Sequence, residues 1–85
     1  MPNYNYNKGV RKERKLVNVA KSAGLLAFRS AGSHSPIDVV IIDKRERVIK
    51  FIQCKPDNIS ERNKDILIQE QSDLNGSFLA RFMVI

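Results

Sequence analysis

Eighty-five residues, 42% of them hydrophobic, allow one folded domain with little room for a second. Cys54 is the only cysteine, so the sequence excludes a disulfide framework. No stretch approaches the roughly 18 apolar residues of a membrane span, and the first residues lack the apolar core of a secretory signal. These features favour an intracellular, cytoplasmic setting. The 15 Lys and Arg against 9 Asp and Glu give a formal charge of +6, which attracts polyanions such as nucleic acid, although small basic domains of other kinds carry similar charge.

The first part of the chain is polar and then becomes periodic. Residues 1–7 are predicted to form a flexible N-terminal arm, and residues 8–85 a single compact domain. A helix is predicted over 8–23, where apolar residues recur at helical spacing, and Gly24 is a good helix stop.

The middle and end of the chain alternate between strand and helix signals. Strands are predicted over 25–29, 37–43 and 48–55, with a loop at 30–36 and a charged turn at 44–47. Asn58 is predicted to cap a second helix, with Glu61 three residues on, and this helix runs to about Leu74. A final strand is predicted over 77–85. The order α-β-β-β-α-β predicts an α/β fold with a short mixed sheet flanked by two helices.

Glu13 stands out because it falls on the apolar face of the first predicted helix. It lies three residues after Val10, three and four before Leu16 and Val17, and seven before Ala20. A carboxylate there costs free energy unless a cation or a metal compensates it. The alternative is a carboxylate at the rim that reaches water or pairs with a lysine.

Three more polar residues lie at the ends of predicted strands. Asp38 opens an apolar strand, and Gln53 and Lys55 end the next one, two residues apart and therefore on one face. If the hairpin pairs residue 43 with residue 48, Asp38 lies opposite Gln53, with Cβ atoms about 5 Å apart. A slip of one residue would send Asp38 to the other face. The alternative is that these residues are polar because the strand ends leave the core. This explains each residue singly but does not explain why three of them converge.

Such a cluster suits phosphodiester hydrolysis. Hard oxygen ligands hold Mg²⁺, which lowers the pKa of a bound water and offsets charge on the transition state. A lysine beside it can orient or deprotonate the attacking water.

These motifs resemble the archaeal-type Holliday junction resolvases in order and in near-identical spacing over about 8–55. The matching stretches are Lys8-Gly9, Glu13-Arg14, Phe28-Arg29-Ser30-Ala31-Gly32-Ser33, Pro36-Ile37-Asp38-Val39-Val40 and Ile52-Gln53-Cys54-Lys55. The resemblance implies a restriction-endonuclease-like PD-(D/E)xK core, a homodimer that binds branched DNA at four-way junctions, and incisions that depend on Mg²⁺, with Mn²⁺ as a substitute. It also implies an association with the nucleoid.

The resemblance assigns roles to particular residues. The catalytic positions fall on Glu13, Asp38, Gln53 and Lys55, and the metal ligands on Glu13, Asp38, Gln53 and the backbone carbonyl of Cys54. The resemblance also places Arg14, Arg29, Ser30 and Ser33 at positions associated with DNA contact or phosphate orientation. Charge adds Lys8 and Arg11 to the DNA-contact candidates, and a place in the loop adds His34, although a lone loop histidine more often has no such role. For the basic residues of the first helix, a solvated face is the alternative to phosphate contact.

Gln53 departs from the family pattern, which usually has a carboxylate at this place. An amide oxygen can ligate a cation but carries no charge, so metal affinity should fall. Gln-x-Lys variants occur in type IV restriction-like nucleases of the same superfamily, and Gln53 is therefore interpreted as a tolerated variant.

The sequence supports a Mg²⁺-dependent endonuclease acting on four-way junctions as the first hypothesis. The alternatives are a duplex-cutting restriction- or repair-type nuclease of the same fold, a junction-binding module with little turnover, and a basic domain that binds RNA or a protein.

Overall fold

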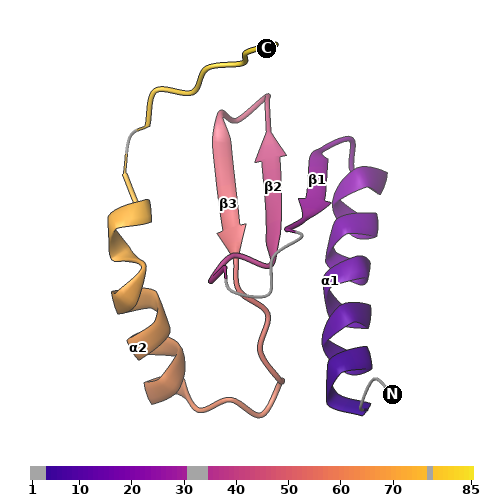
Figure 1. Cartoon of the computed structure of the whole chain (residues 1–85), viewed down its shortest axis with the longest axis vertical. Helices are drawn as coiled ribbons and strands as arrows, with labels where there is room; N and C mark the ends of the chain where they lie inside the picture. The colour runs from indigo at the N-terminus through magenta and orange to yellow at the C-terminus, as the bar shows by residue number, and fades with distance from the viewer. Residues whose placement is uncertain (1–3, 31–34, 77) are drawn as a thin grey trace.

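Two helices, three strands and a short 3-10 helix make up the described part of the chain (Figure 1). The structure is a computed structural model that describes residues 4–30, 35–76 and 78–85, with residues 4–8 described by their backbone alone. The elements in chain order are α1 (Tyr4–Ser22), β1 (Leu26–Arg29), β2 (Val39–Asp43), β3 (Val48–Ile52), α2 (Glu61–Glu70) and η1 (Ser72–Leu74). The strands form one antiparallel sheet in the order β1-β2-β3.

Helix α1 begins at Tyr4, four residues earlier than predicted, so residues 4–7 of the predicted arm are helical. The apolar pattern starts only later, but extending an existing helix gains a backbone hydrogen bond for each added residue. The helix ends where predicted. Gly24 has a φ of 82°, its N–H donates to the carbonyl of Lys21, and the N–H of Leu25 donates to the carbonyl of Ala20. This is a Schellman motif, in which a glycine adopts the left-handed conformation that ends the helix.

The hairpin between β2 and β3 has the predicted register, because Asp43 pairs with Val48 and Val39 pairs with Ile52. The side chain of Asp43 holds the turn: its Oδ1 accepts hydrogen bonds from the backbone N–H groups of Arg45 and Glu46, both at 3.0 Å. An aspartate that bonds the backbone two and three residues on favours a tight turn over alternative pairings.

The sheet differs from the predicted one in its last strand. A mixed sheet needs a strand that returns through α2, and residues 77–85 were predicted to be that strand. Residues 78–85 form no strand, and their large apolar side chains are exposed. The apolar pattern alone predicted a strand there, but a strand also needs a neighbour for its backbone groups. The prediction of a mixed sheet is therefore wrong for the described residues, which form a purely antiparallel sheet.

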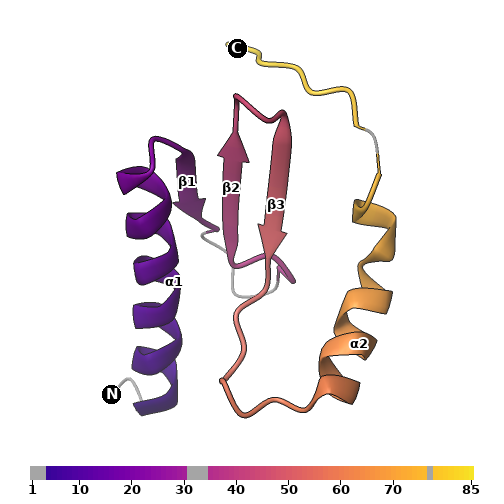
Figure 2. The same ribbon diagram turned by 180° about the vertical axis from the view of Figure 1, so that it is seen from behind.

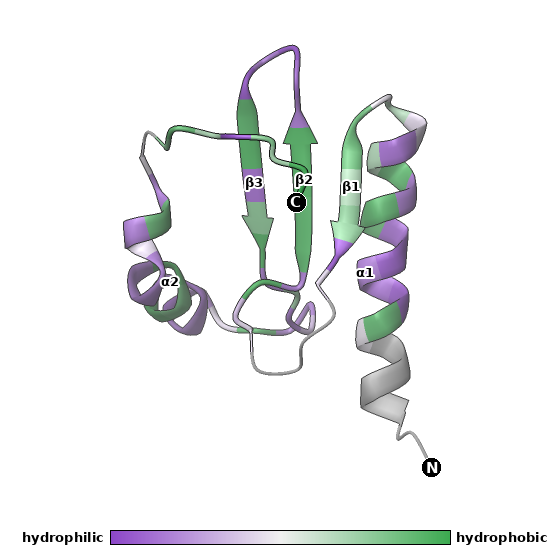
Figure 3. Cartoon of the chain, turned by 45° about the horizontal axis from the view of Figure 1, so that its top comes forward, coloured by the Kyte–Doolittle hydropathy of each residue, from purple (hydrophilic) through white to green (hydrophobic). Residues whose placement is uncertain are grey.

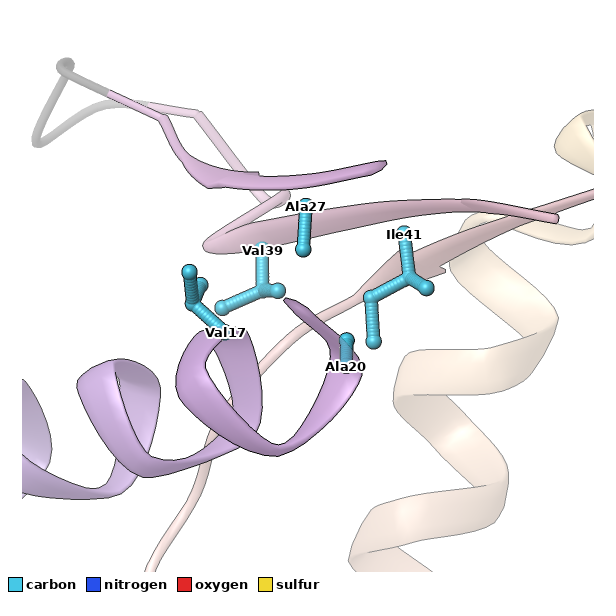
Figure 4. Close-up of a cluster of buried hydrophobic side chains, with 5 residues drawn as sticks. All are labelled: Val17, Ala20, Ala27, Val39 and Ile41. Atoms are coloured by element: carbon cyan, nitrogen blue, oxygen red, sulfur yellow. The ribbon is translucent and has the colours of Figure 1, made fainter. Parts of the chain in front are cut away.

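The core lies between α1 and one face of the sheet. Val17 and Ala20 of α1 meet Ala27, Val39 and Ile41 of the strands (Figure 4). The two alanines keep the helix close to the sheet, and Val39 is fully buried. Packing of α1 on β1 and β2 is thus what holds the helix beside the strand ends.

Truncating the core should cost much more than truncating the surface of α1. Ile41 is 8% exposed and Val19 is 61% exposed. We expect Ile41→Ala to lower the free energy of unfolding by about 2–5 kcal/mol, because it leaves a cavity in the core. Val19→Ala should change it by less than about 0.5 kcal/mol. Chemical denaturation of both variants measures the difference, and equal losses would contradict this packing of α1.

Helix α2 begins at Glu61, with Ser60 as its N-cap instead of the predicted Asn58. The Ser60 hydroxyl accepts a hydrogen bond from the backbone N–H of Asn63 at 3.1 Å. Asn58 lies inside a turn that the N–H of Ile59 closes onto the carbonyl of Pro56, so the helix cannot start there. The chain leaves α2 at Glu70 and continues as η1 to Leu74.

The two helices flank the two edges of the sheet. Helix α1 lies along β1, and α2 lies beyond β3, as Figure 1 and the reverse view in Figure 2 show. No residue of α2 is buried, whereas α1 supplies part of the core. Neither helix among the described residues is long and apolar enough to cross a bilayer.

The face of the sheet away from the α1 core is apolar and partly exposed. Residues paired directly across antiparallel strands share a face, and the register places six apolar side chains together in two rows. We call this the open apolar face: Leu26, Ile42 and Ile49 in one row, and Phe28, Val40 and Phe51 in the other. Four of the six are 40–52% exposed. The strands are hydrophobic along most of their length (Figure 3).

Candidate functional site

The predicted catalytic residues gather at one end of the sheet. Strands β1 and β3 finish there and β2 begins there, as Figure 1 shows. Asp38 directly precedes β2, and Gln53, Cys54 and Lys55 directly follow β3. Arg29 is the last residue of β1. The antiparallel order of three short strands is therefore what brings these segments to the same place.

Asp38 is fixed between its two neighbouring strands. Its N–H donates to the carbonyl of Ile52 at 2.8 Å, and its own carbonyl accepts from the N–H of Ser30 at 3.0 Å. Its carboxylate Oδ2 accepts from the backbone N–H of Cys54 at 2.8 Å. Since Val39 pairs with Ile52, one further step places Asp38 opposite Gln53, as the hairpin prediction required.

Glu13 pairs with Arg29. The Arg29 Nε donates to Glu13 Oε2 at 2.8 Å, and the two side chains are 33% and 17% exposed. A carboxylate that is mostly removed from water needs such compensation. The prediction of Glu13 on the inner side of α1 is confirmed. Its cation is an arginine from β1, and not the lysine that the sequence left open as an alternative.

The Cys54 thiol is affected by the charges of both carboxylates. Burial raises the pKa of this thiol, and the negative charges of Asp38 and Glu13 raise it further, while Lys12 acts in the opposite direction. The thiol thus stays protonated at neutral pH and is a poor nucleophile. It packs against the core. Both carboxylates therefore contribute to the electrostatic environment of this thiol, Asp38 from the start of β2 and Glu13 from α1.

Gln53 and Lys55 face a groove, which the two carboxylates do not line. The groove has a volume of about 400 Å³ and runs between α1, the segment after β3, and α2. Its walls are mostly apolar, and its polar lining includes Lys12, Gln53, Lys55 and Lys64. Gln53 is half-buried and Lys55 is exposed. Residues 53–55 therefore border both this groove and the strand end at which Asp38 lies.

The donor chemistry at the strand ends fits a hard divalent cation. Among the described residues, no three His, Cys, Asp or Glu side chains form a ready metal cluster. Asp38 and Glu13 each use one carboxylate oxygen in the bonds described above. Their second oxygens, the amide oxygen of Gln53 and the carbonyl of Cys54 make an all-oxygen set. Mg²⁺ is commonly held by one or two carboxylates with water in the remaining positions, so these residues fit it.

The DNA-contact candidates occupy different environments. Arg11 and Arg14 are exposed on α1, whereas Arg29 is engaged by Glu13. The Ser30 hydroxyl donates to the carbonyl of Ile37 and so closes the base of the loop. Two candidates, Ser33 and His34, lie outside the described residues, and Lys8 is described by its backbone alone.

Lys12 is a site residue that the sequence did not indicate. Its Nζ donates to the backbone carbonyl of Lys55 at 2.7 Å and to Asp57 Oδ1 at 2.8 Å. It is one of several cations on α1, and helical periodicity gives no reason to distinguish it from Arg11 or Lys15. The contact joins residues 43 positions apart in the chain, which only the folded structure brings together.

This small α/β arrangement of two helices and a three-stranded antiparallel sheet, with acidic, amide and lysine residues at the strand ends, fits the PD-(D/E)xK-like nucleases. The family model described as archaeal Holliday junction resolvase (hjc) matches residues 4–76. The chain therefore belongs to the archaeal Holliday junction resolvase family, which acts on branched DNA junctions. No curated protein and no solved structure matches the chain.

Proposed function

We propose that this protein is a metal-dependent endodeoxyribonuclease that binds four-way DNA junctions and cleaves them by phosphodiester hydrolysis. The observation that carries the proposal is the register of the β2–β3 hairpin, which sets Asp38 opposite Gln53 and beside the Cys54 N–H. Glu13 reaches the same region from α1. Family membership supplies the branched substrate. An intracellular location at the nucleoid follows from that substrate.

Each residue of the site has a distinct part in this reaction. Asp38, Glu13, Gln53 Oε1 and the Cys54 carbonyl would hold Mg²⁺ or Mn²⁺. When bound, the ion lowers the pKa of a coordinated water and offsets charge on the phosphate. The Lys55 side chain is exposed beside these ligands and can orient the attacking water or donate to a phosphate oxygen.

The exposed cations of α1 provide the electrostatic part of DNA binding. Arg11, Arg14 and Lys15 are exposed on the helix that carries Glu13. Contacts from such residues to phosphates release counterions, so binding weakens as salt rises. Lys8, Arg29, Ser30, Ser33 and His34 complete the proposed contact set.

A homodimer forms the second part of the proposal. The open apolar face leaves four large side chains 40–52% exposed, and a contiguous apolar patch on a small domain is typical of an interface. Pairing with a second copy would cover it and would add buried area to a domain with a small core.

A charge in the open apolar face should therefore separate the subunits. We expect Phe28→Asp to sediment as a monomer under conditions in which the unchanged protein sediments as a dimer. Val19→Asp, on the exposed side of α1, should remain dimeric. Dissociation by Phe82→Asp, with Phe28→Asp still dimeric, would place the interface on residues 78–85 instead.

A junction-binding module with little turnover is the second candidate function, and two observations favour it. Gln53 brings no charge to the metal site, and the ion pair with Arg29 offsets the charge of Glu13. Both features lower the attraction for a cation. A duplex-cutting nuclease on the same fold is the third candidate.

The deciding experiment compares a labelled, immobile four-way junction with a linear duplex of the same sequence, in Mg²⁺ and in EDTA. Paired symmetric nicks in the junction alone, lost in EDTA, support the resolvase. Junction binding without cleavage in either Mg²⁺ or Mn²⁺ leaves the binding module. Equal cutting of both substrates leaves a nuclease without junction selectivity.

A further inference from the structure

The segment 53–57 carries the candidate Gln-x-Lys residues but lies outside the sheet. The pairing of β3 with β2 ends at Ile52, whose carbonyl accepts the N–H of Asp38. Two side chains form hydrogen bonds that join the segment to α1 and to the start of β2. Asp38 accepts the N–H of Cys54, and Lys12 donates to the carbonyl of Lys55. Side chains, and not a strand ladder, hold this part of the site.

The two contacts hold the segment from different sides. The peptide N–H of Cys54 is fixed by a carboxylate from the start of β2, and the carbonyl of Lys55 is fixed by an ammonium from α1. The carbonyl of Cys54 belongs to the peptide unit between these two fixed groups. Fixing the neighbouring units holds both ends of this planar unit, so its remaining freedom is the paired rotation about the ψ of Cys54 and the φ of Lys55. The direction of the Cys54 carbonyl and the exit of the Lys55 side chain depend on both contacts.

The carbonyl contact matters more than the ion pair with Asp57. The Lys12 side chain is 41% exposed and that of Asp57 is 90% exposed, so solvent screens the attraction between their charges. The hydrogen bond to the Lys55 carbonyl is short, at 2.7 Å, and its donor is charged, which makes such bonds stronger than neutral ones.

We propose that Lys12 is a positioning residue for the cleavage reaction, which holds the Lys55 carbonyl and thereby aims the Cys54 carbonyl and the Lys55 side chain at the site of Asp38. This inference rests on the proposed nuclease function. It separates Lys12 from the other cations of α1: Arg11, Arg14 and Lys15 meet the DNA backbone, whereas Lys12 acts within the protein.

The test compares Lys12→Gln, Lys12→Arg and the matched control Lys15→Gln, which removes the same charge from an exposed position of the same helix. We expect Lys12→Gln to lower the single-turnover cleavage rate at saturating junction by about 10- to 100-fold, since misplacing catalytic groups slightly has effects of this size. Junction affinity should fall no more than in Lys15→Gln. Lys12→Arg, which keeps a charged donor, should recover most of the rate.

A second readout does not depend on cleavage. In ¹H–¹⁵N spectra of the DNA-free protein, the amide signals of Gln53, Cys54 and Lys55 should move in Lys12→Gln and stay in place in Lys15→Gln.

Two outcomes would overturn the proposal. One is a Lys12→Gln variant that matches Lys15→Gln in both rate and amide signals, since Lys12 would then be one more phosphate contact. If the unchanged protein cleaves nothing, the nuclease proposal fails, and unmoved amide signals would separately overturn the role of Lys12.

Discussion

Replacing Asp38 with asparagine should reduce junction cleavage by about 100-fold or more while leaving junction binding intact. The change removes one negative charge from the proposed metal site, and with it most of the attraction for the ion that activates water. The variant should still fold, because the asparagine amide oxygen can accept the Cys54 N–H that Asp38 Oδ2 accepts. Single-turnover cleavage and gel-shift binding of the same junction measure the two effects separately.

The matched control is Asp65→Asn, which makes the same chemical change on the exposed surface of α2. Its cleavage rate should equal that of the unchanged protein. If Asp38→Asn cleaves as fast as Asp65→Asn, Asp38 does not bind a catalytic metal ion and the proposed site is wrong. A parallel loss of junction binding would instead show that the variant has lost its structure.

Replacing Gln53 with glutamate should lower the Mg²⁺ concentration needed for half-maximal cleavage by about tenfold. A full negative charge opposite Asp38 adds a Coulombic attraction for the ion that the amide lacks. The same charge repels Asp38 when no ion is present, because directly opposed like charges destabilise a strand pair by about 0.2–1 kcal/mol. The variant should therefore melt at a slightly lower temperature in EDTA and regain this loss in Mg²⁺.

Gln69→Glu on the exposed face of α2 controls for the added charge and should change neither the Mg²⁺ dependence nor the melting temperature. A Gln53→Glu variant that melts identically in EDTA and in Mg²⁺, with an unchanged Mg²⁺ requirement, would remove Gln53 from the metal site. In that case Gln53 would be only a polar residue at the margin of the groove.

The part of the site that depends on local geometry could be predicted from the sequence. A four-residue charged turn fixed the pairing of Asp43 with Val48, and the two-residue period of a strand then carried this register to Asp38 and Gln53. Helical periodicity placed Glu13 on the side of α1 that faces the sheet. In both cases the position of a side chain follows from the repeat of one helix or one hairpin over a few residues, so errors in the predicted register stay small.

Contacts between distant segments could not be predicted in this way. Arg29 is the partner of Glu13, and Lys12 holds the carbonyl of Lys55, yet each contact joins two different elements, 16 and 43 residues apart, so no repeat within one helix or strand relates the partners. Which cation meets which acceptor depends on how α1 lies across the sheet. The small residues Ala20 and Ala27 decide that approach, and their effect appears only after the elements have packed.

Elements at the end of the chain were predicted least well. Residues 77–85 have the composition of a strand, but a strand also needs a partner edge, and residues 78–85 have none. For α2, the sequence predicted Asn58 as the N-cap, whereas the structure has Ser60. The turn closed by Pro56 and Ile59 decides between them, and it depends on the direction in which the chain leaves β3.

The turn that Asp43 stabilises also limits which insertions and deletions the hairpin tolerates, although it lies far from the proposed catalytic residues. It touches no residue of the site, yet it determines how far each strand runs before it reaches Asp38 and Gln53. Adding or deleting one residue between positions 44 and 47 would shift the two strands past each other by one step and turn Asp38 away from Gln53. The length of the hairpin loop thus matters to the reaction although no loop residue takes part in it, and within the loop Arg47, with a φ of 59°, has a conformation that few residue types favour.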